Sequence, residues 1–395
     1  MGGAERQMAG LATMLCKAGH EVELICYRSG SFYLPCLLEA GVRCVRLGGP
    51  QEDCGGAVPR PCGSSDRAIV RALVAELKAF GCEVLISFLA GTNVKACLAH
   101  RLYPHFRLVV SERNANSRLL PHDLLRFALY REASAVVCNS HTQEEFVRSR
   151  CKWLRSRLHC IPNFVDTERF SPAAECSFSE TDCHGTGAEA GSTAEHCPAT
   201  DAGLNSTGTG CSSPLRIVTT ARICKRKNAA GLLKAAALCS GEAEIRFEWY
   251  GTGAEGRYAS ECSRLRGALG LDASFVFHPE VREVEQCYRS ADAFCLPSFY
   301  EGTSNSLAEA LSCGLPVICS DVSDASLYVR DGVNGFLFNP HDTASIARAL
   351  RRFASLTAGQ RHSFGAESRR VALDNFAPEI FIGRYLDLLG SLVLR

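Results

Sequence analysis

The sequence predicts an α/β protein with two doubly wound, Rossmann-like domains that face each other across a cleft. Short β-rich runs alternate with apolar patterns of helical spacing in both halves of the chain, which is typical of parallel sheets with crossover helices. The length of 395 residues is too great for one ordinary core. A segment rich in Gly, Ser and Thr separates the two halves, so we expect one domain on each side of it.

The composition is that of a globular protein without a strongly charged partner. Hydrophobic residues make up 46% of the chain, and the formal net charge of +1 gives no reason to expect nucleic acid as a partner. Many of the 22 cysteines lie in apolar runs such as VVCNS and VICSD, where a thiol acts as a small hydrophobe. A disulfide scaffold is the alternative. We expect reduced thiols in a cytoplasmic enzyme, because the chain opens without a signal peptide and has no stretch of about 18 apolar residues.

Residues 1–170 are expected to form the first domain. The opening helix, residues 4–19, has apolar residues at helical spacing and ends in Gly19, which suits a left-handed C-cap. Further helices are predicted at residues 31–41 and 68–81, and the second of these also ends in glycine. Strands are predicted at residues 20–27, 42–49, 82–90, 108–112 and 135–140.

Residues 171–213 interrupt this alternation. Gly, Ser, Thr and Ala dominate the segment, and no apolar period survives in it. Such a segment cannot bury enough surface to offset the entropy of ordering it. We therefore expect a disordered insertion between the domains.

Residues 214–375 are expected to form the second domain. Its strands are predicted at residues 215–222, 245–251, 275–278, 293–298, 316–321 and 335–338. Its helices are predicted at residues 228–239, 258–270, 283–291, 306–314 and 343–356. A C-terminal helix within residues 376–395 has an apolar stripe that must be covered, and we expect it to pack back toward the first domain.

The stretch TTARICKRKNAAG joins a strand to a helix in the second domain and carries several cations. Arg222 and Lys227 lie in this loop beside the start of the helix, where free backbone N–H groups favour an anion. Two cations at such a place suit a phosphate or a diphosphate. A solvated basic loop is the alternative, since Lys225 and Arg226 are there too.

The stretch YEGTSNSLAEA places two carboxylates around the start of another helix of this domain. Glu301 lies in the loop after a strand, and Glu309 lies in the second turn of the helix. A loop carboxylate can accept hydrogen bonds from sugar hydroxyls, and a helix carboxylate that faces a cleft can hold a ribose diol. The alternative is a helix cap with a solvated Glu309.

The run EGTSNSLAEA resembles the E-x7-E motif of the retaining glycosyltransferases of family 4, which have the GT-B fold. Other stretches resemble landmarks of that family in the same order: GGAER and GHEVELI at the start, then SERN, VCNS and IPNFVDTERF. In the second domain, ARICKRKN resembles the R-x4-K loop, and LSCGLPVICSDV and DGVNGFLF resemble the stretches after E-x7-E. The resemblance covers nearly the whole chain apart from the insertion.

The resemblance implies three catalytic residues, which are Arg222, Lys227 and Glu301. Arg222 and Lys227 would hold the diphosphate of a nucleotide sugar and neutralise the charge on the leaving nucleoside diphosphate. Glu301 would contact a hydroxyl of the donor sugar, and Glu309 would bind the ribose hydroxyls. The sugar and the β-phosphate would be oriented by the backbone amides of Gly302, Thr303, Ser304 and Asn305.

On the side of the first domain, the resemblance implies that Gly2 and Gly3 let the backbone approach the diphosphate, as glycine permits. Glu112, Arg113 and Asn114 are candidate cleft residues that would line the donor-sugar or acceptor side. The alternative is that Glu112 and Arg113 pair with each other or with a neighbour.

The implied activity is that of a hexosyl- or N-acetylhexosaminyl-type transferase, as in polysaccharide biosynthesis. It would move a sugar from a nucleotide-sugar donor, expected to be a UDP-sugar, to a glycan or lipid-linked acceptor with retention at the anomeric carbon. No cofactor is expected. No metal is expected either, because the sequence shows no cluster of metal ligands and the basic pair can replace a cation.

A basic helix with interleaved apolar residues, RSRCKWLRSRLHC, is predicted at residues 148–160. Such a helix would suit peripheral contact with an anionic membrane surface on the cytoplasmic face. A solvated helix with a half-buried stripe is the alternative.

Members of the family begin with a strand before the Gly-Gly loop, whereas here Met1 directly precedes GGAER. We therefore expect the first strand of the N-terminal domain to be missing. This expectation supports an alternative function, that of a truncated or decayed non-catalytic paralogue. A nucleotide-sugar epimerase with the same two-domain fold is a weaker alternative, because it does not require R-x4-K and E-x7-E together.

Overall fold

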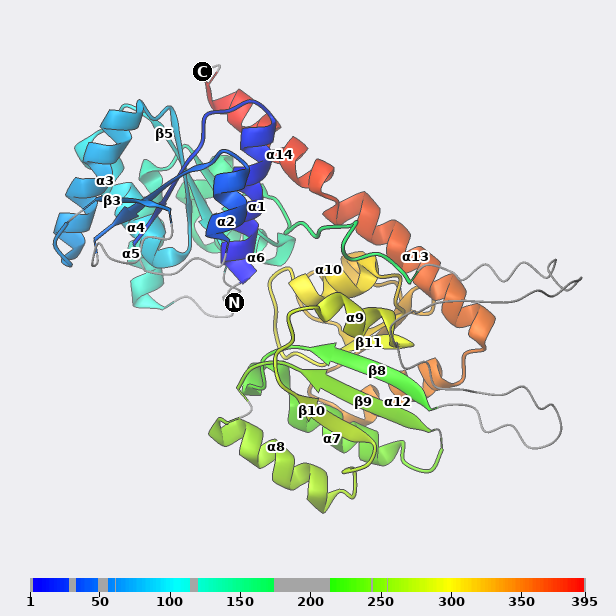
Figure 1. Cartoon of the computed structure of the whole chain (residues 1–395). Coiled ribbons are helices and arrows are strands. Elements are labelled where there is room, and N and C mark those ends of the chain that lie inside the picture. The colour runs from blue at the N-terminus through cyan, green and yellow to red at the C-terminus, as the bar shows by residue number, and fades with distance from the viewer. Residues whose placement is uncertain are drawn as a thin grey trace, which may run out of the picture.

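The structure, a computed structural model, describes residues 3–27, 33–48, 56–60, 62–113, 120–173, 214–242, 244–253 and 255–393. Within these residues the chain forms two α/β domains whose sheets are parallel, which confirms the predicted fold class (Figure 1). Gly2, Asn114 and the predicted disordered insertion from residue 174 onwards lie outside the described residues.

The first domain contains two parallel sheets, with the strand orders β1-β2-β3 and β4-β5-β6-β7. The first sheet consists of β1 (Glu23–Cys26), β2 (Arg43–Leu47) and β3 (Val58–Arg60). The second consists of β4 (Val84–Phe88), β5 (Arg107–Glu112), β6 (Ala135–Cys138) and β7 (Leu158–Cys160).

The division of this sheet falls between β1 and β4. In the part of the chain that the structure describes, β1 pairs with β2 alone and β4 with β5 alone, so each has one edge without a ladder partner. Both strands keep several half-buried residues, whereas β6 is buried along its length. Ile25 of β1 and Leu85 of β4 nevertheless pack against the same core. The expectation of a missing first strand stays a prediction.

Six α-helices of the first domain are described: α1 (Gly3–Lys17), α2 (Leu34–Glu39), α3 (Asp66–Phe80), α4 (Ala90–Leu102), α5 (Pro121–Leu129) and α6 (His141–Arg150). Local signals fix the ends of α3. Ser65 accepts a hydrogen bond from the Ala68 N–H at 3.2 Å, and Gly81 closes the helix in the left-handed region with φ of 69°.

The helix predicted at residues 148–160 is wrong. α6 ends within this stretch, a 3₁₀ turn follows at Lys152–Arg157, and β7 then pairs with β6. Trp153 Nε1 donates to the Phe127 carbonyl at 3.0 Å, and Leu154 is fully buried. The apolar residues of the stretch therefore pack onto the first domain and do not form the stripe of one amphipathic helix.

The second domain has one six-stranded sheet with the order β10-β9-β8-β11-β12-β13. The strands are β8 (Leu215–Thr220), β9 (Ile245–Tyr250), β10 (Phe275–His278), β11 (Ala293–Leu296), β12 (Val317–Ser320) and β13 (Gly335–Phe338). The helices between them are α7 (Ala229–Leu238), α8 (Arg257–Ala268), α9 (Val284–Arg289), α10 (Asn305–Ser312) and α11 (Ala325–Tyr328), and α12 (Thr343–Ala354) follows β13.

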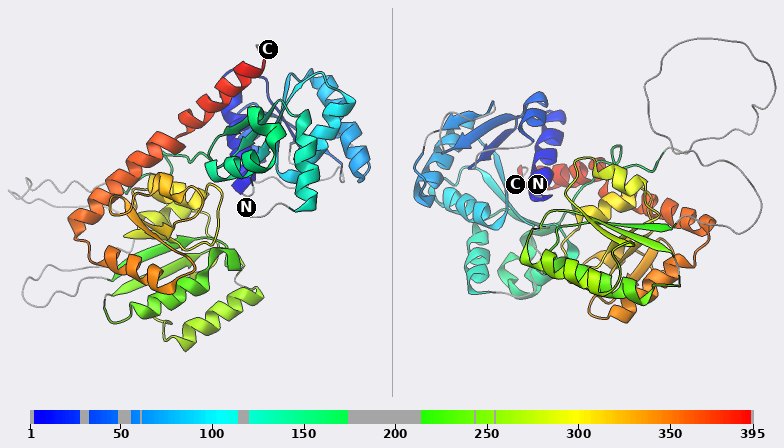
Figure 2. Two further views of the ribbon diagram at one scale, coloured as in Figure 1. Left: turned by 180° about the vertical axis from the view of Figure 1, so that it is seen from behind. Right: turned by 60° about the horizontal axis from the view of Figure 1, so that its bottom comes forward.

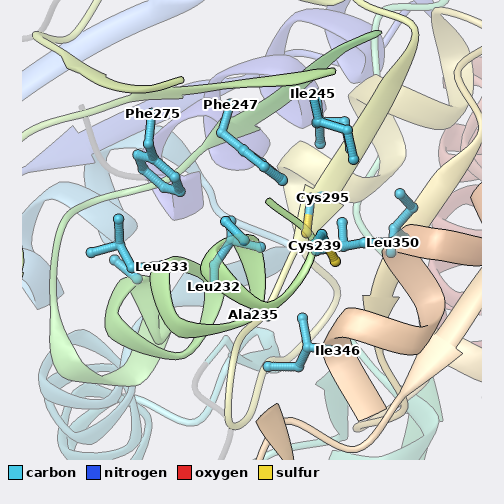
Figure 3. Packing of buried hydrophobic residues seen from close by; sticks show 14 of the residues in the cluster. Leu232, Leu233, Ala235, Cys239, Ile245, Phe247, Phe275, Cys295, Ile346 and Leu350 are labelled. Atoms are coloured by element: carbon cyan, nitrogen blue, oxygen red, sulfur yellow. The ribbon is translucent and has the colours of Figure 1, made fainter. Parts of the chain in front are cut away.

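Figure 3 shows how apolar side chains of this domain fill the space between sheet and helices. Leu232 and Leu233 of α7 and Ile346 and Leu350 of α12 belong to the same buried cluster as Phe247 of β9. This core holds the sheet against its helices. It therefore also fixes the strand ends from which the loops of the domain begin.

Two long helices end the described chain. α13 (Ala358–Phe376) packs against α10 of the second domain, whereas α14 (Pro378–Val393) lies against the first domain (Figures 1 and 2). Phe381 and Tyr385 of α14 share a buried cluster with Leu11 of α1 and Phe88 of β4. The chain therefore crosses from the second domain back to the first.

The described cysteines are not joined by disulfides, and several of them are fully buried in strands; the expectation of reduced thiols stays a prediction. None of the described helices combines the length and the apolar character that a membrane span requires.

Candidate active site

The second sheet reverses its strand order between β8 and β11. These two strands are neighbours, although the chain continues from β8 to β9 on one side and from β11 to β12 on the other. The loops that leave them contain the basic stretch 222–227 and the stretch 297–304. In open α/β sheets, ligands bind beyond the carboxyl ends of the strands at such a switch point. The topology thus brings both sequence-predicted loops to one place.

The basic loop is fixed at its end by Asn228. This residue adopts the left-handed conformation with φ of 56°, and its side chain accepts a hydrogen bond from the Gly231 N–H at 3.1 Å, which caps α7. Its Nδ2 donates to the Pro340 carbonyl at 3.1 Å. Lys227, the residue before it, is buried and held at the start of the helix.

Two cations of this loop contact Glu301. Lys227 Nζ donates to Oε1 at 2.6 Å, and Arg226 Nη1 donates to Oε2 at 3.0 Å. The sequence alone does not distinguish Arg226 from a solvated cation of the same loop. Its contact with Glu301 identifies Arg226 as part of the site. Arg222 is exposed, and no described residue engages its guanidinium. Its charge is therefore free to meet an anion in the cleft.

Burial pushes the pKa of Glu301 up, but Lys227 and Arg226 pull it down by more, so the pKa lies below its ordinary value. Glu301 is therefore ionised at neutral pH. Because both oxygens face cations, the loop carboxylate is held in one orientation in the wall of a cavity.

That cavity lies beyond the strand ends of the second sheet. It is lined by backbone and side chains of the loop after β11, by the start of α10 and by residues after β12, namely Leu296, Ser298, Glu301, Gly302, Thr303, Ser304, Leu307, Cys319, Ser320, Val322, Asp324, Ala325 and Tyr328. Four of the predicted donor-site residues therefore share one cavity.

The first domain closes over this loop. The Thr303 hydroxyl donates to the Asn139 carbonyl, and a side chain at Gly302 would place its Cβ 3.2 Å from the Asn139 amide group. Asn163 Nδ2 donates to the Thr303 carbonyl at 3.2 Å and to Asn305 Oδ1 at 2.7 Å. These contacts bring the start of α10 against the VCNS and IPNF stretches of the first domain.

Glu309 lies in the second turn of α10 and is buried. Tyr288 Oη donates to its Oε2 at 2.8 Å, and Arg6 Nη2 pairs with its Oε1 from the first domain. Gly3 lies nearby, since a Cβ at this position would be 2.6 Å from Asn305 Nδ2. Glycine at position 3 thus allows the N-terminus of α1 to approach the N-terminus of α10.

Of the SERN stretch, Glu112 is buried inside the first domain, and Arg113 is held by Asn163 and by Tyr385 of α14. Glu112 pairs with Arg126 at 3.2 Å and accepts a hydrogen bond from Tyr130, and burial raises its pKa. Arg113 Nη1 donates to Asn163 Oδ1 at 2.6 Å, so it supports the residue that bonds the loop after β11. Each therefore pairs with a neighbour rather than with the other.

Asp324, a cavity residue that sequence reasoning did not select, joins the two domains. Its carboxylate accepts hydrogen bonds from the His141 N–H at 2.6 Å, the Thr142 N–H at 2.8 Å and the Thr142 hydroxyl at 2.7 Å. An acid of the second domain thus caps α6 of the first.

Three side chains with metal-ligating atoms come together on the first domain among the described residues, namely His141, Glu144 and Cys160. Glu144 is already paired with Arg148. None of the three lines the cavity. The expectation that the site needs no metal stays a prediction.

Two sequence families match the chain. The family described as "Glycosyltransferase Family 4" matches residues 1–169, and the family described as "Glycosyl transferases group 1" matches residues 214–355. The residues between the two matches, 170–213, include the segment that separates the domains.

Curated relatives match over shorter stretches. A D-inositol 3-phosphate glycosyltransferase of Streptomyces griseus is 37% identical over 93 residues, which cover 23% of this chain and 20% of the relative. The protein of the same name from Salinispora tropica is 33% identical over 131 residues, which cover 33% of this chain and 27% of the relative. The chain thus aligns with less than a third of the length of these relatives.

Solved structures match over the whole chain. A glycosyltransferase from Rickettsia africae superposes with a TM-score of 0.77 at 14% identity, covering 100% of this chain and 96% of that one. HepE from Anabaena, solved in complex with UDP, superposes with a TM-score of 0.76 at 16% identity, covering 99% and 96%. HepE has also been solved with UDP-glucose. At these identities the likeness concerns the fold.

Proposed function

Because the chain has the GT-B fold and both of its halves match glycosyltransferase families, we propose that it transfers a sugar from a nucleotide-sugar donor to a glycan or lipid-linked acceptor. The observation that carries this proposal is the meeting of a basic loop and two carboxylates at the switch point of the second sheet, closed on one side by the first domain.

The basic loop would bind the diphosphate of the donor. Lys227 has three N–H donors, so it can keep its contact with Glu301 and still donate to a phosphate oxygen. Arg222 is exposed and free of described contacts, so it can turn to the same phosphates. As the glycosidic bond breaks, negative charge develops on the leaving nucleoside diphosphate, and these cations would stabilise it.

The two carboxylates would orient the donor. Glu309 is held by Tyr288 and Arg6, one at each oxygen, and each oxygen retains a lone pair that can accept from a ribose hydroxyl. Glu301 would meet a hydroxyl of the sugar, with the amides of residues 302–305 at the same wall of the cavity. In this role both glutamates bind substrate, which differs from the acid and base pair of glycoside hydrolases.

We further propose a UDP-sugar with a hexosyl or N-acetylhexosaminyl group as the donor, and retention at the anomeric carbon. The complexes of HepE with UDP and UDP-glucose support a uridine nucleotide, since that protein shares the fold. In a retaining transfer without a protein nucleophile, a leaving phosphate oxygen would accept the proton of the acceptor hydroxyl.

A turnover assay tests the proposal. Purified protein is incubated with a panel of nucleotide sugars, and release of the nucleoside diphosphate is measured. We expect saturable release that Lys227→Ala and Glu309→Ala each lower by about 100-fold or more. Lys234→Ala on the exposed face of α7 and Glu261→Ala on α8 are matched controls that should leave the rate unchanged. Chelation by EDTA should also leave it unchanged.

A non-catalytic paralogue is the second candidate, and the divided sheet of the first domain favours it. Such a protein would bind the nucleotide and release none of it from a donor. Nucleotide binding without turnover across the whole donor panel would therefore support the second candidate and contradict the first.

A further inference from the structure

Arg6 links the two domains at the donor site. It lies in the first turns of α1, and its guanidinium reaches across to Glu309 on α10, 303 residues later in the chain. The Arg6 side chain is 30% exposed, while that of Glu309 is 7% exposed. Arg6 is thus the more solvent-accessible partner of this pair.

The contact matters because Glu309 is a buried carboxylate. Its Oε2 accepts a hydrogen bond from Tyr288, which belongs to the second domain and is fully buried. Its Oε1 faces Arg6, so its cationic partner among the described residues belongs to the first domain. A buried carboxylate needs both hydrogen bonds and a compensating charge. Glu309 therefore has one partner when the second domain is considered alone, and two when the domains are closed.

We propose that Arg6 is a positioning residue of the donor site, which holds Glu309 for the ribose and so couples nucleoside diphosphate binding to closure of the two domains. This inference rests on the proposed function, because Glu309 is there the ribose-binding residue.

The surroundings of Arg6 support this role. The N-terminus of α1 meets the N-terminus of α10 at Gly3 and Asn305, and Asn163 donates to Asn305 from the same side. Arg6 is therefore carried by a helix whose N-terminus lies against that of α10. Its charge also offsets that of Glu309, which would otherwise repel an approaching diphosphate.

Calorimetry with UDP, GDP and ADP tests the inference. For whichever nucleotide the full-length wild-type protein binds, we expect Arg6→Ala to weaken binding by about 10-fold or more. In turnover assays it should raise KM more than it lowers kcat. Arg6→Lys should recover part of the affinity, since it keeps the charge. Lys17→Ala, at the far end of the same helix, is the matched control and should bind like wild type.

A double-mutant cycle separates this role from a loss of folding. If Arg6 acts through Glu309, Arg6→Ala should weaken binding much less in a Glu309→Gln background than in wild type. An Arg6→Ala affinity within about twofold of wild type, or equal effects in both backgrounds, would overturn the inference and leave the proposed function intact. Failure of the wild type to bind any of the nucleotides would instead overturn the proposed function.

Discussion

At the scale of single residues, both carboxylates of the site already have protein partners, and a nucleotide would bind beside these partners. Glu301 lies between Lys227 and Arg226, and Glu309 lies between Arg6 and Tyr288. Both carboxylates are therefore paired in the structure without a ligand. The pairs hold both carboxylates in fixed orientations, which is the preorganisation that an electrostatic site requires.

The Glu301 pairs give a prediction for stability. Glu301→Gln leaves two cations without their carboxylate, so the free energy of unfolding of the second domain at pH 7 should fall by about 1–3 kcal/mol. The pKa of Glu301 is lowered in the folded protein, so its contribution is present above the ordinary carboxyl pKa and is lost as the pH falls through the lowered value. Urea unfolding at several pH values should show the difference from wild type shrinking below about pH 4.5. A difference that does not change with pH contradicts the account.

The sequence identifies some of these residues and not others. Arg222 and Lys227 lie within one local stretch and Glu301 and Glu309 within another, and the resemblance of these two stretches to the R-x4-K and E-x7-E motifs singles them out. The residues that form contacts across the cleft, Arg6 and Asp324, cannot be identified in this way. Arg6 and Asp324 have local sequence environments that point to no role, because their contacts lie in the other domain and depend on how the domains close.

At the scale of elements, the start of α10 is the part that the sequence predicts best. Proline and glycine break the chain after β11, and the apolar spacing from Leu307 onwards sets the helix. Several other elements are missed or wrongly assigned, among them α4, α5 and the two stretches that follow. The stretch 148–160 has apolar residues that suit a helix on local pattern, and tertiary packing divides it between a helix end, a 3₁₀ turn and a strand. α13 has no clear apolar stripe to reveal it.

The cap of α6 by Asp324 gives a prediction at this scale. Asp324→Ala removes the acceptor for two backbone N–H groups and one hydroxyl, and should destabilise the start of α6 by about 0.5–2 kcal/mol. Amide hydrogen exchange at His141 and Thr142 should therefore become faster.

Ser65→Ala is the matched control for Asp324→Ala, because Ser65 caps α3 within the first domain. It should speed exchange at Ala68 and leave α6 unaffected. Unchanged exchange at Thr142 in Asp324→Ala would show that the contact between the domains does not form in solution.

At the scale of the whole molecule, the chain joins its domains twice. It crosses once before the second domain and again where α14 returns to the first (Figure 2). The sequence shows that the last helix needs a partner, and only the structure shows that α1, β4 and α14 share one core. The divided first sheet makes this added cover important, because β4 keeps one unpaired edge among the described residues.

Shortening a buried side chain of α14 tests whether the stability of the first domain depends on this helix. Phe381 is 2% exposed and packs with Phe164 and Tyr385, so Phe381→Ala should cost the first domain about 3–5 kcal/mol of unfolding free energy. Leu373→Ala, on an exposed position of α13, is the control and should cost less than about 1 kcal/mol. Equal effects of the two changes in urea unfolding would contradict the packing described for α14.

In the proposed site, the basic loop binds the diphosphate and Glu309 binds the ribose of one nucleotide. Calorimetry with UDP and with uridine tests this assignment, because the two ligands differ only in the diphosphate. We expect wild type to bind UDP at least about 10-fold more tightly than uridine. Lys227→Ala should reduce the ratio of the affinities for UDP and uridine. Glu309→Ala should weaken the binding of both ligands and leave this ratio unchanged. A ratio unchanged in Lys227→Ala, or uridine binding unchanged in Glu309→Ala, would contradict the assignment of the site.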